Sequence, residues 1–271
     1  KGAQRWINLG LLQFEPSELM KLALPMMLCW HLHQQRLPIN ARNILICLAF
    51  IAIPVILVLK QPDLGTAILL LIPSLSILLL AGLSWQWIVS MSLTLLASIP
   101  LAWHHLHNYQ KQRVLMFFNP QEDPLGHGYH IIQSKIAIGS GGLWGKGWQM
   151  GTQAHLQFLP EHTTDFIFAL WAEEFGFIGS CLLLGILTLM IFRLLNISLY
   201  AQNSYRRLLS ASIAVMFFIA CAVNIGMVSG LLPVVGVPLT LVSFGGTSMV
   251  SMMIAFGMIM SIHKNRDLMM R

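Results

Sequence analysis

The sequence predicts an all-α, polytopic membrane protein. Hydrophobic residues make up 56% of its 271 residues and charged residues only 10%, whereas a soluble domain carries about 25% charged residues. Its apolar stretches are continuous and roughly 20 residues long, which suits membrane-spanning helices and not the alternating strands of a membrane barrel. We therefore expect helices whose outer surfaces face lipid.

Seven apolar runs have the length and composition of spanning helices. They lie at residues 15–33, 43–60, 64–82, 85–103, 166–195, 207–231 and 238–262. The connections between them are short except for residues 104–165, which are rich in Gly, His and aromatic residues and too polar to span. Residues 1–271 are thus expected to form a single transmembrane domain with one long loop.

The distribution of basic residues predicts the orientation of these spans. Alternate loops on one side hold eight: Arg36, Arg42, Arg193, Arg206, Arg207, Lys264, Arg266 and Arg271. The opposite short loops hold three: Lys1, Arg5 and Lys60. Because basic loops stay inside, the first side is predicted to be cytoplasmic and residues 104–165 extracytoplasmic. The net charge of +6 then reflects membrane topology, and no nucleic-acid partner is expected.

Within the long loop, residues 129–140 have the pattern of a short amphipathic helix. Ile132, Ile136 and Ala137 recur at helical spacing, so the helix is expected to lie in the membrane interface. Glycines permit tight turns directly after it, between residues 139 and 147.

Three polar segments stand at the ends of apolar runs: residues 16–21 (PSELMK), 61–66 (QPDLGT) and 160–166 (PEHTTDF). Each places a carboxylate where lipid should begin, which costs several kcal/mol unless the group is hydrated, paired or protonated. On the predicted topology all three face outward. We therefore expect a polar cavity that opens at the outer membrane face.

These segments belong to a set of strings that resembles the SEDS family of RodA, FtsW and SpoVE, and most closely its elongation branch, RodA. The strings are GAQRWI at 2–7, PSELMKL at 16–22, QPDLGTA at 61–67, GHGYH at 126–130 with QS at 133–134, GSGGLWGKG at 139–147, PEHTTDF at 160–166, and a C-terminal signature from Asn224 to Gly230 with Pro233, Gly236 and SFGGTS at 243–248. The resemblance covers essentially the whole chain.

The resemblance implies a peptidoglycan glycosyltransferase of the bacterial cytoplasmic (inner) membrane that polymerises lipid II on the outer face during cell elongation. SEDS proteins have about ten spanning helices, so the seven here would be the last seven and the first three would be missing. The resemblance also implies two kinds of protein partner, a class B penicillin-binding transpeptidase and other membrane proteins of the elongation complex.

Polymerising lipid II requires a base for the acceptor hydroxyl and positive charge for the departing pyrophosphate. Asp165 is the predicted base, because it stands where the long loop meets a span and because the resemblance places the family's essential aspartate there. Taken alone, its position after Thr163 and Thr164 fits a helix cap equally well.

The acidic residues of the other two polar segments each have two possible roles. Glu18 and Lys21 are three residues apart and can pair on one helix face, either as a self-neutralising ion pair or as a group facing the substrate. Asp63 precedes a helix and is either a cap or a third acid that tunes the site.

Four cations are predicted to bind phosphate, with interfacial anchoring as the alternative: Arg5, Lys60, Arg113 and Lys146. Supporting roles are expected for Glu161, Glu174 and Ser243, with a buried hydrogen-bonded role as the alternative for Glu173 and Glu174. No residue pattern identifies a metal site or a cofactor, and a divalent cation (Mg²⁺ or Mn²⁺) is the alternative to a purely cationic side-chain site.

Two functions of other classes also fit the sequence. A flippase for lipid II would use intramembrane acids as well, but its acids should lie near the bilayer centre and recur in two halves. A scaffold that only anchors a transpeptidase would not need three costly carboxylates. The glycosyltransferase is therefore the leading hypothesis.

Overall fold

The structure, a computed structural model, describes residues 7–8, 13–35, 39–105, 111, 115, 127–152 and 163–264. These residues are almost entirely helical, which confirms the predicted all-α class. They also include two strands, β1 (Ile7–Asn8) and β2 (Gln13–Phe14), which form a short antiparallel pair directly before the first helix, and several non-helical segments that connect the helices. The chain divides into two compact units.

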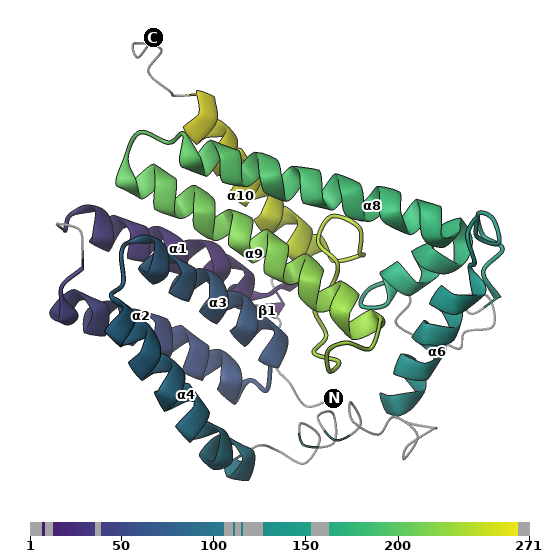
Figure 1. The fold of residues 1–271 in the computed structure, drawn as a ribbon, viewed down its shortest axis with the longest axis horizontal. Helices are drawn as coiled ribbons and strands as arrows, with labels where there is room; N and C mark the ends of the chain where they lie inside the picture. Colours follow the sequence, from purple (N-terminus) through teal and green to yellow (C-terminus); the bar gives the residue numbers. More distant parts are fainter. Residues whose placement is uncertain are drawn as a thin grey trace. The chain divides into compact units, whose positions relative to one another are not determined.

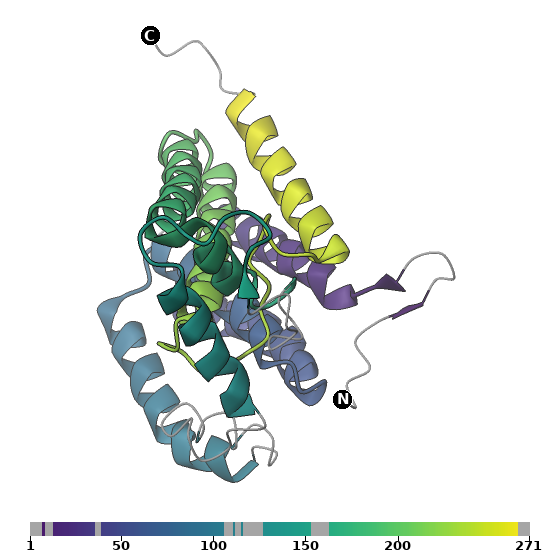
Figure 2. The same ribbon diagram turned by 90° about the vertical axis from the view of Figure 1, so that its right-hand side faces the viewer.

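The first unit comprises Lys1–Leu83, Thr188–Ala220 and Gly245–Arg271. It contains α1 (Pro16–His33), α2 (Ala41–Lys60), α3 (Leu64–Leu80) and α10 (Gly246–Lys264). Helices α1, α2 and α3 pack against one another (Figure 1), and α10 lies beside α1 (Figure 2). The two strands therefore lead directly into the helix that carries Glu18 and Lys21.

The second unit comprises Ser84–Leu187 and Cys221–Phe244. It contains α4 (Trp85–His105), α6 (His127–Ser140), the first part of α8 (Ile167–Leu199) and the last part of α9 (Ser204–Val228). Helices α8 and α9 each continue into the first unit.

Each of the seven predicted spans coincides with a helix, although their boundaries differ. Of the described helices, α2, α8, α9 and α10 are long and apolar enough to cross a membrane, and α3 is apolar but shorter. Large apolar side chains are exposed on these helices, such as Ile53 on α2 at 61% and Leu189 on α8 at 68%, while polar residues such as Glu173 and Asn224 are fully buried. Apolar side chains outside and polar side chains inside suit a protein surrounded by lipid. The pattern agrees with a multi-pass membrane protein.

The predicted start of the last span, at residue 238, is wrong. Helix α10 begins only at Gly246, and residues 231–245, here called the return segment, are not helical. Gly236 and Leu241 have positive φ angles of 75° and 72°, a backbone conformation that an α-helix cannot contain. The apolar composition of this segment thus belongs to a chain that doubles back inside the second unit.

The span predicted at 166–195 is a helix, but it is broken within α8 at Gly176, whose φ and ψ are 65° and −161°. A side chain at this position would overlap the backbone of Leu143 and Gly145. The sequence pattern missed the break, because a single glycine within an apolar run is compatible with an unbroken helix.

Residues 141–147, here called the glycine segment, pair with the backbone groups that the break in α8 leaves without helical partners. The amides of Lys146 and Gly147 donate to the carbonyls of Glu173 and Glu174, each at 3.0 Å. In return, Gly142 and Leu143 accept hydrogen bonds from the amides of Phe177 at 2.9 Å and Ile178 at 3.2 Å. Unsatisfied backbone groups would be costly within a membrane protein, so this exchange makes the broken helix tolerable.

Helix α6 confirms the predicted helix at 129–140, but its buried face differs in part from the prediction. Ala137 is buried as expected, whereas Ile136 is 46% exposed. The face is completed by Ile131 and by Ser134, whose hydroxyl donates to the carbonyl of Val228 on α9 at 2.8 Å. Periodicity alone could not distinguish these adjacent faces, and packing on α9 decides between them.

The break in α8 can be tested by replacing Gly176, with a second glycine of the same helix, Gly185, as the matched control. We expect Gly176→Ala to lower the thermal unfolding temperature, because alanine would be strained by about 1–3 kcal/mol at this φ and ψ and would also overlap the glycine segment. Gly185→Ala, whose added methyl would meet nothing within 4 Å, should leave stability unchanged or raise it by up to about 1 kcal/mol. Equal unfolding temperatures for the two variants would contradict the backbone pairing between the glycine segment and the break in α8.

Candidate functional site

Residues 163–165, which carry the predicted base, lie in a turn directly before α8 and are fixed by the return segment and α9. The hydroxyl of Ser243 donates to the carbonyl of Thr164 at 2.6 Å, and the amide of Phe244 donates to the carbonyl of Thr163 at 2.9 Å. The side-chain amide of Asn224 donates to the carbonyl of Asp165 at 2.9 Å. Three consecutive carbonyls are thus held by residues 59 or more positions away.

The residues that hold this turn are themselves fixed. Asn224 is fully buried, and its amide nitrogen also donates to the carbonyl of Val237 at 2.8 Å. The hydroxyl of Ser243 also accepts a hydrogen bond from the amide of Leu239 at 2.7 Å. Val237 and Leu239 both belong to the return segment. Because Asn224 and Ser243 bond to this segment and to the turn, the turn and the return segment stabilise each other.

The carboxylate of Asp165 is half-buried and lies against Gly236. A Cβ atom added to Gly236 would stand 3.4 Å from the Oδ2 atom of Asp165. A glycine here therefore leaves open the space beside one carboxylate oxygen, on the surface that a reacting group would have to approach. This surface belongs wholly to the second unit.

An ion pair in the same unit joins the glycine segment to α8. The ammonium of Lys146 lies 2.7 Å from the Oε1 atom of Glu173, and Thr152 donates to the same oxygen through its amide and its hydroxyl, each at 2.9 Å. The Glu173 side chain has no exposed surface. A carboxylate buried in this way is normally paired with a cation and hydrogen-bonded, as Glu173 is here. The sequence pointed to Lys146 as a phosphate ligand, and the structure places it beside this acid.

The first unit holds a second polar cluster, which consists of Glu18, Lys21 and Ser251. The ammonium of Lys21 lies 2.7 Å from the Oε1 atom of Glu18, which confirms the expected pairing. The hydroxyl of Ser251 on α10 donates to the other carboxylate oxygen at 2.8 Å. Glu18 and Lys21 are 5% and 8% exposed, so the pair is held in a nearly dry environment.

Asp63 is the N-cap of α3, which confirms one of its two predicted roles. One carboxylate oxygen accepts from the amide of Thr66 at 3.1 Å and the other from the hydroxyl of Thr66 at 2.8 Å. Glu15, directly before α1, has a raised pKa because it is partly buried and because the charges of Asp63 and Glu18 repel its own. The acids of residues 15–18 and 61–66 therefore lie near one another.

The remaining predicted site residues are placed as follows. Lys60 is exposed at the end of α2, Glu174 is buried on α8, and Arg5, Arg113 and Glu161 lie outside the described residues. Within the part of the chain that the structure describes, no three His, Cys, Asp or Glu side chains converge as ligands for a metal ion.

Sequence reasoning missed several members of these clusters. Asn224 entered only as part of a signature string, and neither Ser251 nor Thr152 was expected at all. Each contacts an acid or its backbone across more than 20 positions of the chain. Nothing in the local pattern around a serine or threonine indicates such a partner.

The family model for FtsW, RodA and SpoVE, described as cell cycle proteins, matches residues 1–268. The peptidoglycan glycosyltransferase MrdB of Escherichia coli K12 is 51% identical over 269 residues, which cover 99% of this chain and 73% of that protein. The MrdB of Helicobacter pylori is 40% identical over 268 residues, which cover 95% of this chain and 68% of that protein.

Two solved structures share the fold. A chain from a study of how a peptidoglycan synthase complex coordinates polymerization and crosslinking aligns with a TM-score of 0.82 at 34% identity, covering 99% of this chain and 75% of that chain. The crystal structure of the Thermus thermophilus rod shape determining protein RodA aligns with a TM-score of 0.68 at 27% identity, covering 98% of this chain and 72% of that chain.

The Glu18–Lys21 pair predicts strong coupling between two substitutions. Glu18→Gln should lower the free energy of unfolding by about 3–5 kcal/mol, because it leaves the buried ammonium of Lys21 without its counter-charge. Adding Lys21→Met should recover most of this loss, because both charges are then gone. Unfolding in mixed detergent measures both variants, with Lys60→Met as the exposed-lysine control. If Glu18→Gln alone were as stable as Lys60→Met, the expected coupling between Glu18 and Lys21 would be contradicted.

Proposed function

The chain belongs to the FtsW/RodA/SpoVE family and is a peptidoglycan glycosyltransferase, and we propose that it polymerises lipid II on the outer face of the bacterial cytoplasmic membrane. The role that goes with this activity is cell elongation and the maintenance of rod shape. The observation that carries the proposal is the fixed position of Asp165, a half-buried carboxylate whose backbone is anchored from a distant part of the chain.

In the proposed reaction, Asp165 removes a proton from the acceptor sugar hydroxyl. The hydroxyl oxygen then forms a bond to the anomeric carbon of the donor sugar, which is linked to polyprenyl pyrophosphate. The bond between that carbon and the pyrophosphate oxygen breaks, and the pyrophosphate leaves with the electron pair. The proton passes from the carboxyl group of Asp165 to solvent before the next cycle. Because the leaving group is already an anion, it needs a cation more than a general acid.

The anchoring of residues 163–165 supports this role for Asp165. A general base works only within hydrogen-bonding distance of the proton that it removes, so a misplaced carboxylate loses its effect. Hydrogen bonds from Ser243 and Asn224 to the backbone fix the turn and leave the carboxylate itself beside the open surface at Gly236. We propose that Ser243 and Asn224 are positioning residues for the base.

Cationic side chains are proposed to bind the pyrophosphate of the substrate. Lys21 is proposed to bind the pyrophosphate, with Glu18 and Ser251 keeping its ammonium in place. Arg5 and Arg113 are proposed as further phosphate ligands on the basis of the sequence, because a guanidinium can bind two phosphate oxygens at once. Lys60 is exposed and is proposed to attract the anionic substrate.

The remaining candidates are proposed to support the site. Lys146 is already paired with Glu173, so we assign it to the shape of the glycine segment and only secondarily to phosphate. Glu174 is buried, and its backbone carbonyl accepts a hydrogen bond from Gly147. Glu161 and Asp63 are proposed to adjust the charge around the substrate.

We also propose that the chain works with a class B penicillin-binding transpeptidase and with other membrane proteins of the elongation complex. A structural relative at 34% identity comes from a peptidoglycan synthase complex described as coordinating polymerization and crosslinking, which supports a transpeptidase partner. Crosslinking the product as it emerges would require the two proteins to meet at the outer membrane face.

The proposed base predicts a large loss of activity when one carboxylate oxygen of Asp165 is replaced by an amide nitrogen. Asp165→Asn should reduce polymerisation of labelled lipid II by about 10²–10⁴-fold, the usual contribution of a general base. The assay uses the full protein purified with its transpeptidase partner, whose own active site is inactivated so that only polymerisation is read. Asp267→Asn, which removes an acid from the predicted cytoplasmic tail, should retain the full rate.

Two outcomes would contradict this assignment. Polymer of normal length and rate from the Asp165→Asn variant would remove Asp165 as the base. Movement of intact lipid II across vesicles, without any polymer, would favour the flippase considered for the sequence.

A further inference from the structure

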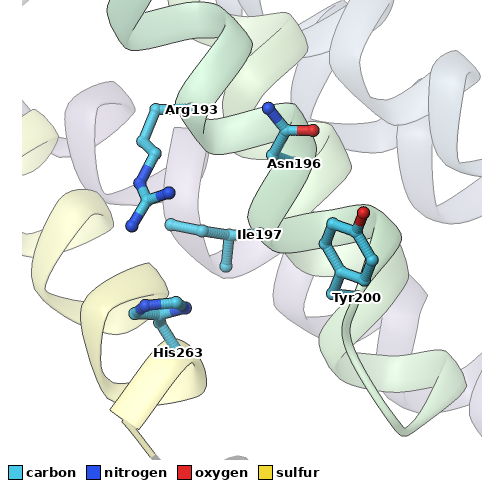
Figure 3. Close-up of a pocket in the computed structure, with 5 residues that line it drawn as sticks. All are labelled: Arg193, Asn196, Ile197, Tyr200 and His263. Atoms are coloured by element: carbon cyan, nitrogen blue, oxygen red, sulfur yellow. The ribbon is translucent and has the colours of Figure 1, made fainter.

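A cavity of about 310 Å³ lies in the first unit, at the ends of α8 and α10, and none of its lining residues is assigned to the reaction. It is lined by Arg193, Asn196, Ile197, Tyr200 and His263 (Figure 3). The first four come from the last turns of α8 or directly follow it, and His263 comes from the last turn of α10. The last part of α8, from Thr188, and the whole of α10 belong to the first unit.

The cavity lining is chemically one-sided. Arg193 carries a permanent positive charge, while Asn196, Tyr200 and His263 each offer a polar group that can donate a hydrogen bond. None of the five lining residues is acidic. The guanidinium of Arg193 points toward the ring of His263 across the cavity (Figure 3), so two groups that would repel each other when both are charged converge on one space.

The imidazole of His263 forms part of the cavity wall. Its Nδ1 atom is buried and has no hydrogen-bond partner within the described part of the chain. Because that atom has almost no accessible surface, a ligand in the cavity would meet the rest of the ring. An anionic oxygen in the cavity would neutralise the charge of Arg193.

The position of the cavity suits the boundary between headgroups and acyl chains. Arg193 stands six residues before the end of α8 at Leu199, which is about 9 Å along a helix. Tyrosine favours this depth as well. The neighbouring basic residues, Arg206, Arg207 and Lys264, place the ends of α8 and α10 on the predicted cytoplasmic side, where anionic lipids gather.

The dipoles of α8 and α10 would not attract an anion to this cavity. The C-terminal end of a helix carries about half a negative charge and repels anions. The attraction must therefore come from the side chains, of which the full charge of Arg193 is the largest contribution. The volume of about 310 Å³ is at the lower end of the roughly 300–1,000 Å³ of ligand pockets, which suits a small charged group.

We propose that this cavity binds an anionic phosphate group on the cytoplasmic side, with Arg193 as the principal ligand and Asn196, Tyr200 and His263 as hydrogen-bond donors. The phosphate belongs either to the headgroup of an anionic phospholipid or to free phosphate. The site is separate from the proposed glycosyltransferase chemistry, and neither depends on the other.

The test measures binding of phosphatidylglycerol to the full purified protein in a neutral detergent, with bound lipid counted by native mass spectrometry. Arg193→Gln should weaken binding by about tenfold or more, the usual effect of losing a hydrogen bond to a charged group. Arg207→Gln removes the same charge from the same side but does not line the cavity, and it should change binding by less than about twofold.

The wild-type protein provides tests that do not depend on the folding of a variant. Phosphatidylglycerol should bind more tightly than phosphatidylcholine, and it should raise the thermal unfolding temperature more. Displacement of the lipid by inorganic phosphate would identify free phosphate as a ligand, and failure to displace it would identify the lipid headgroup. Equal binding of the two lipids, or equal effects of Arg193→Gln and Arg207→Gln, would overturn the proposal.

Discussion

Hydrogen bonds from Ser243, Phe244 and Asn224 to the carbonyls of residues 163–165 are the interaction on which the proposed active site depends. Non-helical backbone within a membrane protein must find its partners inside the protein, because lipid offers none. The turn before α8 and the return segment are both non-helical, and each satisfies groups of the other. The proposed base is therefore placed by the same bonds that allow the backbone to leave the helical conformation.

The same constraint explains the broken helix and its glycine segment. The break at Gly176 leaves carbonyls and amides of α8 without helical partners, and residues 142–147 supply partners for both kinds. The ion pair between Lys146 and Glu173 joins the same two elements. A rigid connection between the glycine segment and α8 follows, and α8 is the helix that begins directly after Asp165. Both arrangements belong to the second unit, and the contact between the glycine segment and α8 depends on close backbone approaches that only glycine permits.

The parts of this structure that the sequence predicted are those determined by nearby residues. The apolar runs located the helices, the spacing of three residues predicted the Glu18–Lys21 pair, and the position of Asp63 before a helix predicted its role as a cap. The contact of Ser251 with Glu18 spans 233 positions, and no local pattern encodes it. Residues 238–245 of the return segment were assigned to a helix because they begin an apolar run, although the backbone at Leu241 is incompatible with one.

The kinetic constants of Ser243→Ala test the central claim most directly, because this change leaves the carboxylate of Asp165 intact and removes only the hydroxyl that holds its turn. We predict that kcat for lipid II polymerisation falls by about tenfold, as expected for the loss of about one hydrogen bond, while KM changes by less than about twofold. Ser229→Ala is the matched control, since that hydroxyl bonds only within α9 and its end, to Ile225 and Gly226, in the part of the chain described. A kcat for Ser243→Ala equal to that of the control would contradict the account.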